Sequence, residues 1–368
     1  MSDWFSLSNS KSVPSPALIL YPHRIKENIR RMIQVAGGAE RLRPHIKTHK
    51  LAEVVRLQVN DGIRKFKCAT IAEAEMAAAA GAAEVLVAYP PVGPNTGRLL
   101  ELVKRFPGVK FSTIADDAEA IQALSKTFAA ANQSVEVLLD IDCGQHRTGV
   151  EPGPNAVELY RLIGSLPGLS PGGLHVYDGH IHEPDPFKRA SLCDAAFAPV
   201  KTFQIELTKA GFPVPRLVAG GTPTFPIHAK NSQFECSPGT CVLWDFGYST
   251  KFADLDFLHA AVVLTRVVSK PASGCLCLDL GHKAIAAENP HPRVQFPDLP
   301  DAIAVSHSEE HLVVQTARAS QFSIGDCLYG IPRHVCPTVA LYSEAVAVNN
   351  GAAAERWEIT ARKRRLTI

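Results

Sequence analysis

One stretch, Val135-Glu136-Val137-Leu138-Leu139-Asp140-Ile141, decides the fold. Its run of β-branched and leucine residues predicts a buried β-strand. The stretch ends in Asp142-Cys143-Gly144-Gln145-His146-Arg147-Thr148-Gly149, a polar segment that predicts a loop. A buried strand followed by a polar loop is the unit from which the rest of the chain can be interpreted.

The same unit recurs on both sides of this stretch. Further strands are predicted at residues 17–20, 65–69, 84–88, 109–114, 174–177 and 216–219, with helical patterns between them. Thr70 and Glu73 form a capping box at the start of one helix. Strand and helix alternate about eight times from residue 15 to about 240, which predicts parallel strands with crossover helices. We therefore expect an α/β protein with a (β/α)8, TIM-like barrel over residues 15–245.

The pattern changes after about residue 250. Short apolar or alternating runs separated by turns predict a C-terminal, β-strand-rich domain over residues 246–368, together with residues 1–14. The length of 368 residues suits one large and one smaller domain. A hydrophobic content of 46% and a charged content of 20% predict a globular protein rather than a disordered one.

Charge and cysteine content exclude several classes of partner. A formal net charge of +2 with scattered Lys and Arg argues against a nucleic-acid binder. No apolar run has the length of a membrane span, so we expect no membrane partner. The nine cysteines are odd in number and dispersed, which argues against a disulfide scaffold and predicts a cytoplasmic location.

A basic segment, Arg43-Pro44-His45-Ile46-Lys47-Thr48-His49-Lys50, carries the first candidate for chemistry. Lysine forms imines with aldehydes when its amine is neutral, and neighbouring cations and burial lower its pKa. Arg43, His45, His49 and Lys50 are expected to supply that setting for Lys47. The alternative is a solvated or anion-binding basic loop.

Three further segments lie at predicted strand ends. Arg147 can bond a phenolate or carboxylate, or form a surface ion pair. The segment Tyr177-Asp178-Gly179-His180-Ile181-His182 is dense in groups that bond or transfer protons. Gly220-Gly221-Thr222-Pro223-Thr224 offers backbone amides and hydroxyls to a phosphate, or is an ordinary turn. Dinucleotide and P-loop motifs are absent from the sequence.

His334-Val335-Cys336 is the candidate metal motif. In an extended segment, alternate side chains point to the same face, so imidazole and thiolate would converge on one ion, for which zinc is suited. Two ligands predict an open, catalytic site, and Glu309, Glu310 or His311 could complete or orient it. The alternative is a buried cysteine beside a surface histidine.

Together these motifs resemble the D-threonine aldolase and D-serine dehydratase family, within the alanine-racemase-like, fold-type III enzymes that use pyridoxal 5'-phosphate. The resemblance covers nearly the whole chain. It implies that Lys47 binds the cofactor aldehyde and that the cofactor contacts are Arg147, Tyr177, Gly221, Thr222, Gly239 and Thr240. It also implies that His334 and Cys336 bind a divalent metal (Mn2+, Zn2+ or Mg2+) and that the protein is a homodimer.

The resemblance implies metal-dependent retro-aldol cleavage of D-threonine or a related D-β-hydroxy-α-amino acid to glycine and an aldehyde. His180, or a metal-bound hydroxide, is the candidate base for the β-hydroxyl proton. Dehydration of D-serine or 3-hydroxyaspartate to a keto acid and ammonia is the nearest alternative, because dehydratases of the family often carry cysteine where Cys336 lies. An amino-acid racemase and a non-catalytic pyridoxal-phosphate carrier are the remaining alternatives.

Overall fold

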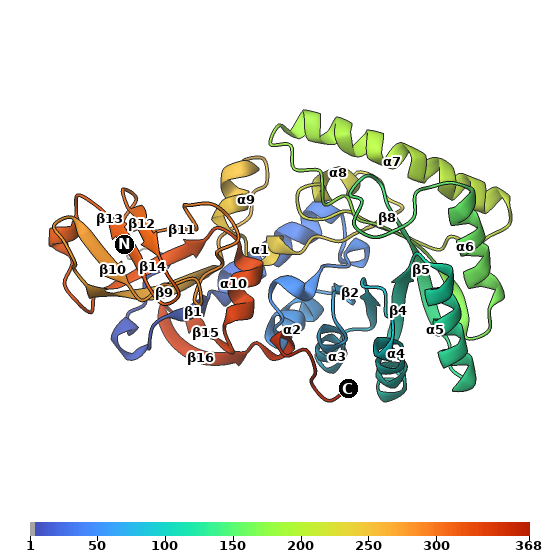
Figure 1. Cartoon of the computed structure of the whole chain (residues 1–368), viewed down its shortest axis with the longest axis horizontal. Coiled ribbons are helices and arrows are strands. Elements are labelled where there is room, and N and C mark those ends of the chain that lie inside the picture. Colours follow the sequence, from blue (N-terminus) through green and yellow to red (C-terminus); the bar gives the residue numbers. More distant parts are fainter. Residues whose placement is uncertain (1–3) are drawn as a thin grey trace. The chain divides into compact units, whose positions relative to one another are not determined.

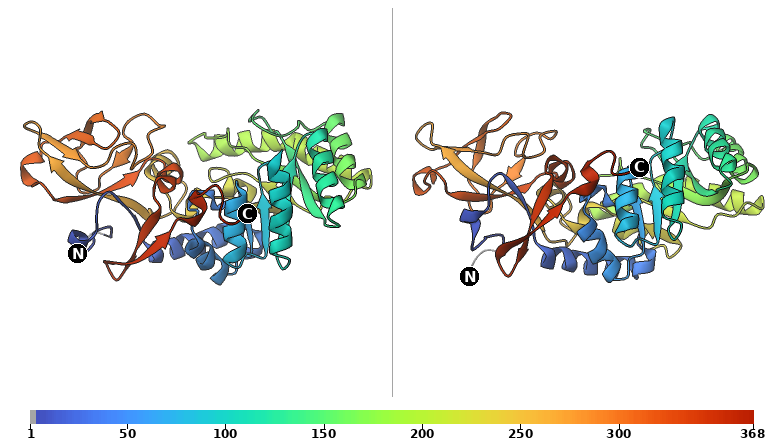
Figure 2. Two further views of the ribbon diagram at one scale, coloured as in Figure 1. Left: turned by 60° about the horizontal axis from the view of Figure 1, so that its bottom comes forward. Right: turned by 90° about the horizontal axis from the view of Figure 1, so that it is seen from below.

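The computed structural model describes residues 4–368, which form two compact units (Figures 1 and 2). The barrel unit comprises Arg30–Lys47, Ala52–Gly239 and Lys363–Ile368. The strand-rich unit comprises the chain up to Ile29, Thr48–Leu51 and Thr240–Arg362. The chain therefore passes from one unit to the other directly after Lys47 and again directly after Gly239.

The barrel unit contains a parallel sheet whose strands follow one another in chain order (Figure 1). Each strand pairs with the next in parallel register, as β/α alternation predicts. The seven strands are β2 (Lys65–Cys68), β3 (Glu84–Val87), β4 (Lys110–Ala115), β5 (Val135–Ile141), β6 (Leu169–Val176), β7 (Leu217–Ala219) and β8 (Phe234–Cys236).

An extended segment closes this sheet between its two edge strands. Leu42 forms a parallel bridge with Cys236 of β8, and His45 forms one with Lys67 of β2. The Arg43 N–H donates to the Cys236 carbonyl at 2.8 Å, and the Lys67 N–H donates to the Pro44 carbonyl at 2.9 Å. Residues 42–45 thus take the eighth position, and the predicted (β/α)8 class is confirmed. The segment that closes the barrel therefore leads directly into Lys47.

Helices follow the barrel strands, and Figure 1 shows α3 to α6 on the outside of the sheet. Thr70 caps α3 by accepting the Glu73 N–H at 3.1 Å, as its motif predicts. The Glu73 carboxylate returns to the Ala69 N–H at 2.7 Å, one residue before the cap. The helices of this unit are α2 (Ala52–Asn60), α3 (Ile71–Ala79), α4 (Pro94–Arg105), α5 (Ala118–Ala130), α6 (Pro154–Ser165), α7 (Pro186–Lys209) and α8 (Phe225–His228).

A chain of ion pairs joins the N-terminal ends of the barrel strands. The fully buried Arg43 guanidinium pairs with both Glu84 and Glu235, each at 2.7 Å. Lys65 also pairs with Glu235, at 2.6 Å. Arg216 extends the chain from Glu84 to Glu136, and Lys110 ends it. Arg43 was expected to act on Lys47, but its charge is engaged by two glutamates in this network.

The strand-rich unit is built on a mixed sheet with the order β12-β13-β10-β9-β1-β15-β16. Strand β14 pairs with β9, and β11 pairs with β14. These strands are β1 (Ala17–Leu20), β9 (Ala261–Ser269), β10 (Cys275–Leu278), β11 (Val294–Gln295), β12 (Ile303–His307), β13 (Leu312–Gln315), β14 (Cys327–Pro332), β15 (Glu344–Asn349) and β16 (Ala352–Glu358).

One predicted strand belongs to a different sheet than expected. The run Ala17–Leu20 was expected to be the first barrel strand, but it pairs with β9 and β15. Four consecutive apolar residues fit the interior of either sheet, so their pattern does not choose between them. The helix that follows, α1 (Pro22–Ala36), carries the chain from the strand-rich unit into the barrel unit. Among the described residues, no helix combines the length and the apolar character that crossing a membrane requires.

Candidate active site

Three cationic side chains surround the Tyr177 ring after strand β6. Lys47 lies in a short 3-10 turn (Ile46–Thr48) directly after the closing segment, and its Nζ is 5.8 Å from the ring centroid. Lys67 Nζ on β2 is 5.6 Å from that centroid, and Arg147 Cζ, in the loop after β5, is 5.1 Å from it. The structure thus brings together Lys47, Arg147 and Tyr177, as the sequence predicts.

Lys67 is the member of this group that the sequence did not reveal. Its side chain is buried, and burial together with the charge of Lys47 lowers the pKa of Lys67 to about 7. His49 contributes no charge, because burial lowers its pKa to about 3. The cation beside Lys47 is therefore Lys67, which is 20 residues away in the chain. Alternation along β2 points Lys67 into the barrel, but the sequence does not say what it meets there.

The Tyr177 ring is in close contact with two glycines. A Cβ at Gly221 would lie only 2.9 Å from a ring carbon, and one at Gly179 would overlap the ring. Any larger residue at Gly221 would displace the ring or the loop. The two glycines thus allow the Tyr177 ring to lie against the backbone at both positions.

The loop after β7 is rich in glycine and is held by its own hydrogen bonds. Gly220 has a φ of 65°, a left-handed conformation that favours glycine. The Gly221 N–H points to the Thr224 hydroxyl at 3.3 Å, and the Thr222 hydroxyl accepts the Gly239 N–H at 3.1 Å. Thr222 and Gly239, both predicted for the phosphate, are therefore neighbours. Thr240 follows Gly239 in the chain and belongs to the strand-rich unit.

A buried polar cluster contacts this loop through the Thr224 side chain. Asp178 accepts the Thr224 hydroxyl at 2.9 Å and contacts His228 Nε2 at 2.6 Å. Cys193 Sγ is 3.3 Å from the same His228 nitrogen. Asp178, Cys193 and His228 each bring one ligand atom within 4.8 Å of the others, so this cluster could also hold a metal ion. The sequence singled out Asp178 only as part of its polar segment.

Two buried polar atoms among the described residues fit a polar ligand in the barrel. Asp140 and His175 bond to each other at 2.6 Å from neighbouring strands β5 and β6. Their other atoms, Asp140 Oδ2 and His175 Nε2, are buried without a hydrogen-bond partner. Together with Lys47, the Tyr177 ring and the glycine-rich loop after β7, they fit pyridoxal phosphate, which carries an aldehyde, a flat ring and a phosphate.

His180, the predicted base, lies on the loop after β6. Its side chain is exposed, and its ring faces the loop after β5, because a Cβ at Gly144 would be 3.1 Å from His180 Nε2. The small residue at 144 therefore leaves room for the imidazole.

His334 and Cys336 come together within the strand-rich unit. The segment is not the extended strand we expected, because Val335 opens helix α10 (Val335–Leu341) and only the capping His334 is extended. The two side chains nevertheless hydrogen-bond to each other. Cys336 Sγ is also 3.2 Å from Thr48 Oγ1 and 3.7 Å from Thr240 Oγ1.

The electrostatics of this pair suit a metal ligand set. Burial alone raises the pKa of the Cys336 thiol, but the neighbouring His334 outweighs it, so the net pKa lies below the ordinary value. Glu288 contacts His334 Nδ1 at 2.6 Å, which leaves Nε2 for an ion, as in many carboxylate–histidine–metal sites. Glu309 and Glu310, expected to assist here, pair instead with Lys283. Imidazole and thiolate backed by a carboxylate fit a divalent metal.

Comparison with known proteins identifies the family. Residues 21–244 match the alanine racemase N-terminal domain, and residues 260–348 match the putative serine dehydratase domain. D-threonine aldolase from Arthrobacter sp. is 30% identical over 95% of this chain and 93% of its own length. The crystal structure of D-threonine aldolase from Filomicrobium marinum superposes with a TM-score of 0.89 at 28% identity, covering 96% of both chains.

A dehydratase is also similar. D-threo-3-hydroxyaspartate dehydratase from Delftia sp. HT23 has a TM-score of 0.83 at 26% identity, covering 95% of this chain and 98% of that one. A D-threo-3-hydroxyaspartate dehydratase variant with a cysteine replaced by alanine is also similar, and its structure is of the metal-free form. Domain order, coverage and identity agree, so the chain belongs to the D-threonine aldolase and D-serine dehydratase family of alanine-racemase-like, pyridoxal-phosphate-dependent lyases.

Proposed function

We propose that the protein cleaves D-threonine or a related D-β-hydroxy-α-amino acid to glycine and an aldehyde in a metal-dependent reaction. The observation that carries the proposal is the pairing of His334 with Cys336, backed by Glu288, in a chain that also surrounds Lys47 and Tyr177 with cations. A cofactor that withdraws electrons from Cα and a metal that acidifies a β-hydroxyl together support Cα–Cβ cleavage. The D-configuration follows from the relatives, one of which is a D-threonine aldolase.

In this proposal the barrel unit holds pyridoxal phosphate. Lys47 supplies the amine for its aldehyde, and its phosphate is assigned to Gly221, Thr222, Gly239 and Thr240. The Gly221 and Gly239 N–H groups would exchange their present hydroxyl acceptors for phosphate oxygens. Arg147 bonds its phenolic oxygen, and Tyr177 lies against its ring. When bound, the cofactor accepts the electron pair that is released as the Cα–Cβ bond breaks.

His334 and Cys336 hold a divalent metal, Mn2+, Zn2+ or Mg2+, which lowers the pKa of the substrate's β-hydroxyl. The carboxylate of Glu288 keeps the His334 ring in position. His180 removes the proton from that hydroxyl. Its exposed position on the loop after β6 lets it return the proton to water.

The second candidate is a D-serine or 3-hydroxyaspartate dehydratase. Cys336 favours it, since the resemblance implies that dehydratases of the family often carry cysteine at this position, and a D-threo-3-hydroxyaspartate dehydratase is among the similar structures. In that reaction Lys47 removes the Cα proton and the β-hydroxyl leaves. A racemase or a non-catalytic pyridoxal-phosphate carrier would leave the His334–Cys336 pair without a task, so neither is favoured.

We further propose a cytoplasmic homodimer that acts on a small D-amino acid. All nine cysteines are free, as a reducing compartment allows. Light scattering of the purified holoenzyme tests the dimer, and a monomeric mass would overturn it.

Product analysis tests the proposed reaction. The holoenzyme is incubated with D-threonine, with L-threonine in a parallel sample and with a chelator in a third. Glycine and acetaldehyde from D-threonine alone, lost with chelator, support the aldolase. Formation of 2-oxobutanoate and ammonia would instead identify the protein as a dehydratase. H180N is the matched variant, and as a catalytic base His180 should account for about 10²–10⁴-fold in kcat.

A further inference from the structure

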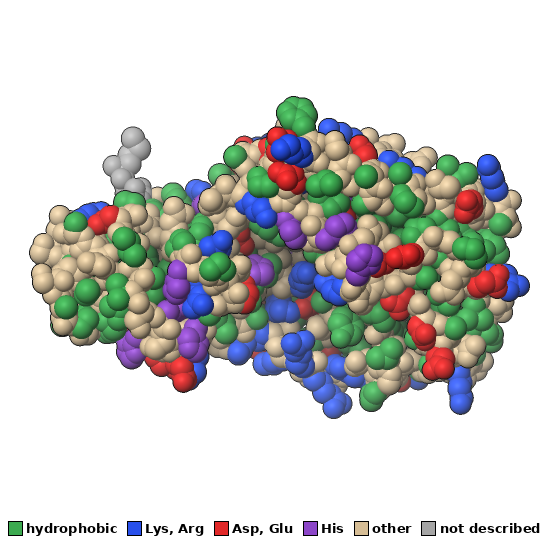
Figure 3. All heavy atoms as spheres, turned by 45° about the horizontal axis from the view of Figure 1, so that its top comes forward, with side chains coloured by type: hydrophobic (Ala, Val, Ile, Leu, Met, Phe, Trp, Pro, Cys, Tyr) green, Lys and Arg blue, Asp and Glu red, His purple; other side chains and the backbone are tan. Residues whose placement is uncertain are grey.

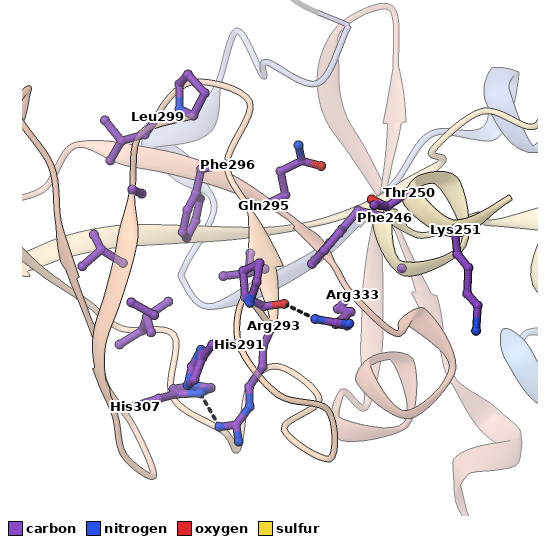
Figure 4. A pocket seen from close by; sticks show the side chains of 18 residues that line it. Phe246, Thr250, Lys251, His291, Arg293, Gln295, Phe296, Leu299, His307 and Arg333 are labelled. Atoms are coloured by element: carbon purple, nitrogen blue, oxygen red, sulfur yellow. Dashed lines mark hydrogen bonds between the residues drawn. The ribbon is translucent and has the colours of Figure 1, made fainter. Parts of the chain in front are cut away.

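The strand-rich unit contains a cavity of about 560 Å³ that none of the residues assigned above lines (Figure 4). Cavities that take small organic molecules measure about 300–1,000 Å³. Residues of α9 (Phe246–Lys251), of the β11 region and of strands β12 and β13 form its walls. In the space-filling view, histidine side chains gather on the surface of this unit beside basic ones (Figure 3).

One wall of the cavity is apolar. Phe296, Leu299 and Val314 are each at most 3% exposed, and their side chains form part of the lining. Phe246 adds a second aromatic ring from α9. Figure 4 shows Phe296 and Leu299 together on one side of the cavity. This wall offers burial to the apolar part of a ligand.

The other wall is cationic and has no counter-charge. Lys251, Arg293 and Arg333 line the cavity together with two histidines, and the lining includes no aspartate or glutamate. Among residues 4–368, none of the three cations is within ion-pair distance of a carboxylate. The same unit pairs Lys283 with Glu309 at 2.6 Å and Glu310 at 3.2 Å, so unpaired cations are not its general rule.

Arg293 is held in place with donors left over. Its Nε donates to the Asn289 carbonyl at 2.8 Å, and its Nη1 contacts His307 Nδ1 at 3.0 Å. His307 Nε2 contacts the Leu280 carbonyl at 3.1 Å, and since a carbonyl only accepts, the ring proton is on Nε2. Neutral His307 Nδ1 therefore accepts from Arg293. Guanidinium carries five N–H groups, so Nη2 remains for a ligand.

Arg333 is fixed by the same loop. Its Nη1 donates to the carbonyls of Pro290 and Pro292, at 3.1 and 3.4 Å. The backbone N–H of Arg333 donates to the Arg293 carbonyl at 2.9 Å. The two guanidiniums are thus positioned before any ligand arrives, which reduces the entropy lost on binding.

We propose that this cavity binds a small amphipathic anion, with a carboxylate or phosphate head on its cationic wall and an apolar body against Phe296, Leu299 and Val314. Guanidinium forks match both head groups in geometry. The apolar body separates such a ligand from free phosphate or acetate, which would use only half of the cavity. The site is independent of the lyase reaction.

Calorimetric titration tests the site on holoenzyme whose cofactor has been fixed by borohydride reduction, so that the cofactor's own phosphate site is filled. The probes are 4-phenylbutyrate and phenyl phosphate, and their relative affinities identify the preferred head group. We expect one saturable site per chain for at least one probe. 4-Phenylbutanamide, which lacks the charge, and inorganic phosphate, which lacks the apolar body, should each bind at least tenfold more weakly.

Two variants test the location from opposite walls. R293Q should weaken binding at least tenfold, and A304F, which fills the cavity from β12 without touching a cation, should abolish it. K270Q is the matched control, because Lys270 also donates to a carbonyl of this unit but does not line the cavity. Binding unchanged in both R293Q and A304F, or no saturable binding of either probe, would overturn the proposal.

Discussion

Asp245 accepts the backbone N–H of Val335 at 3.0 Å, and Val335 is the residue between His334 and Cys336. The other carboxylate oxygen of Asp245 caps α9 by accepting the Tyr248 N–H at 2.9 Å. One buried carboxylate thus joins the start of α9 to the start of α10. The spacing of the two proposed metal ligands depends on it.

D245N should lower metal affinity about 10–100-fold, the usual effect of removing a group that supports metal ligands. An amide can keep only one of the two acceptor contacts, so the variant side chain can no longer join the Val335 N–H at the start of α10 to the Tyr248 N–H of α9. The measurement is the metal dissociation constant of the cofactor-loaded protein. D117N is the control, because Asp117 caps α5 of the barrel unit in the same way. Equal metal affinity in wild type and D245N would contradict this role.

K67M should stabilise the cofactor-free protein and alter its pH dependence. The pKa of Lys67 is about 7 when folded and about 10.4 when unfolded. Between those values the unfolded state binds more protons, so wild-type stability rises with pH across this window. Replacement by methionine should add about 1–4 kcal/mol below pH 7 and little near pH 10.5.

Denaturant titrations of wild type and K67M across pH 6–10.5 check this prediction. K65M provides the control, since Lys65 on the same strand is paired with Glu235 at 2.6 Å. A stability difference that does not change with pH would show that the pKa of Lys67 is not lowered in the folded protein. A loss of activity in K67M is expected, because active sites commonly give up stability for function.

R43M should cost about 1–3 kcal/mol of stability, because Glu84 and Glu235 each lose one cation while Arg216 and Lys65 remain beside them. Activity should stay within twofold, since this network lies at the N-terminal ends of the strands and barrel chemistry lies at the other ends. Urea unfolding and kcat of the same preparation provide the check. R56A, which breaks an exposed pair with Glu53, should change stability by less than about 0.5 kcal/mol. A large loss of kcat in folded R43M would refute this assignment.

C336D should keep a divalent metal but shift the preference toward Mn2+ and Mg2+, because carboxylate oxygen is a harder ligand than thiolate sulfur. C336A should lose the metal. Metal analysis after dialysis against equal concentrations of Zn2+ and Mn2+ distinguishes the variants, with C275S as the cysteine control in the same unit. Retention of zinc by C336A would assign the metal elsewhere, and the Asp178–Cys193–His228 cluster is then the next candidate.

The sequence predicted the barrel class because local patterns determine it. Each strand from β2 to β7 has its own apolar run. Arg147 and Tyr177 belong to polar motifs that follow β5 and β6. The run Ala17–Leu20 was assigned to the wrong sheet, because its partners β9 and β15 lie more than 240 residues away in the chain. Local periodicity contains no information on such pairing.

The sequence predicted those site residues that belong to short motifs. It did not predict those whose roles depend on contacts with distant segments. Lys47, Arg147, Tyr177 and the His334–Cys336 pair are parts of short motifs, and the structure places Lys47 and Arg147 beside the Tyr177 ring. Lys67, Glu288 and Asp245 gain their roles from partners on distant segments, and nothing beside them in the sequence marks those partners. Arg43 is the opposite case. Its place in the basic segment suggested that it acts on Lys47, but in the structure it pairs with Glu84 and Glu235.

An assay of the reverse reaction tests most directly whether the protein is an aldolase. The holoenzyme, with its metal, is incubated with glycine and excess acetaldehyde, and the products are separated on a chiral column. We expect a D-β-hydroxy-α-amino acid, formed at a rate that falls to background in K47A and with a chelator. A dehydratase has no route from glycine to that product. Absence of any D-threonine or its β-epimer, with 2-oxobutanoate formed from D-threonine by the same preparation, would contradict the aldolase.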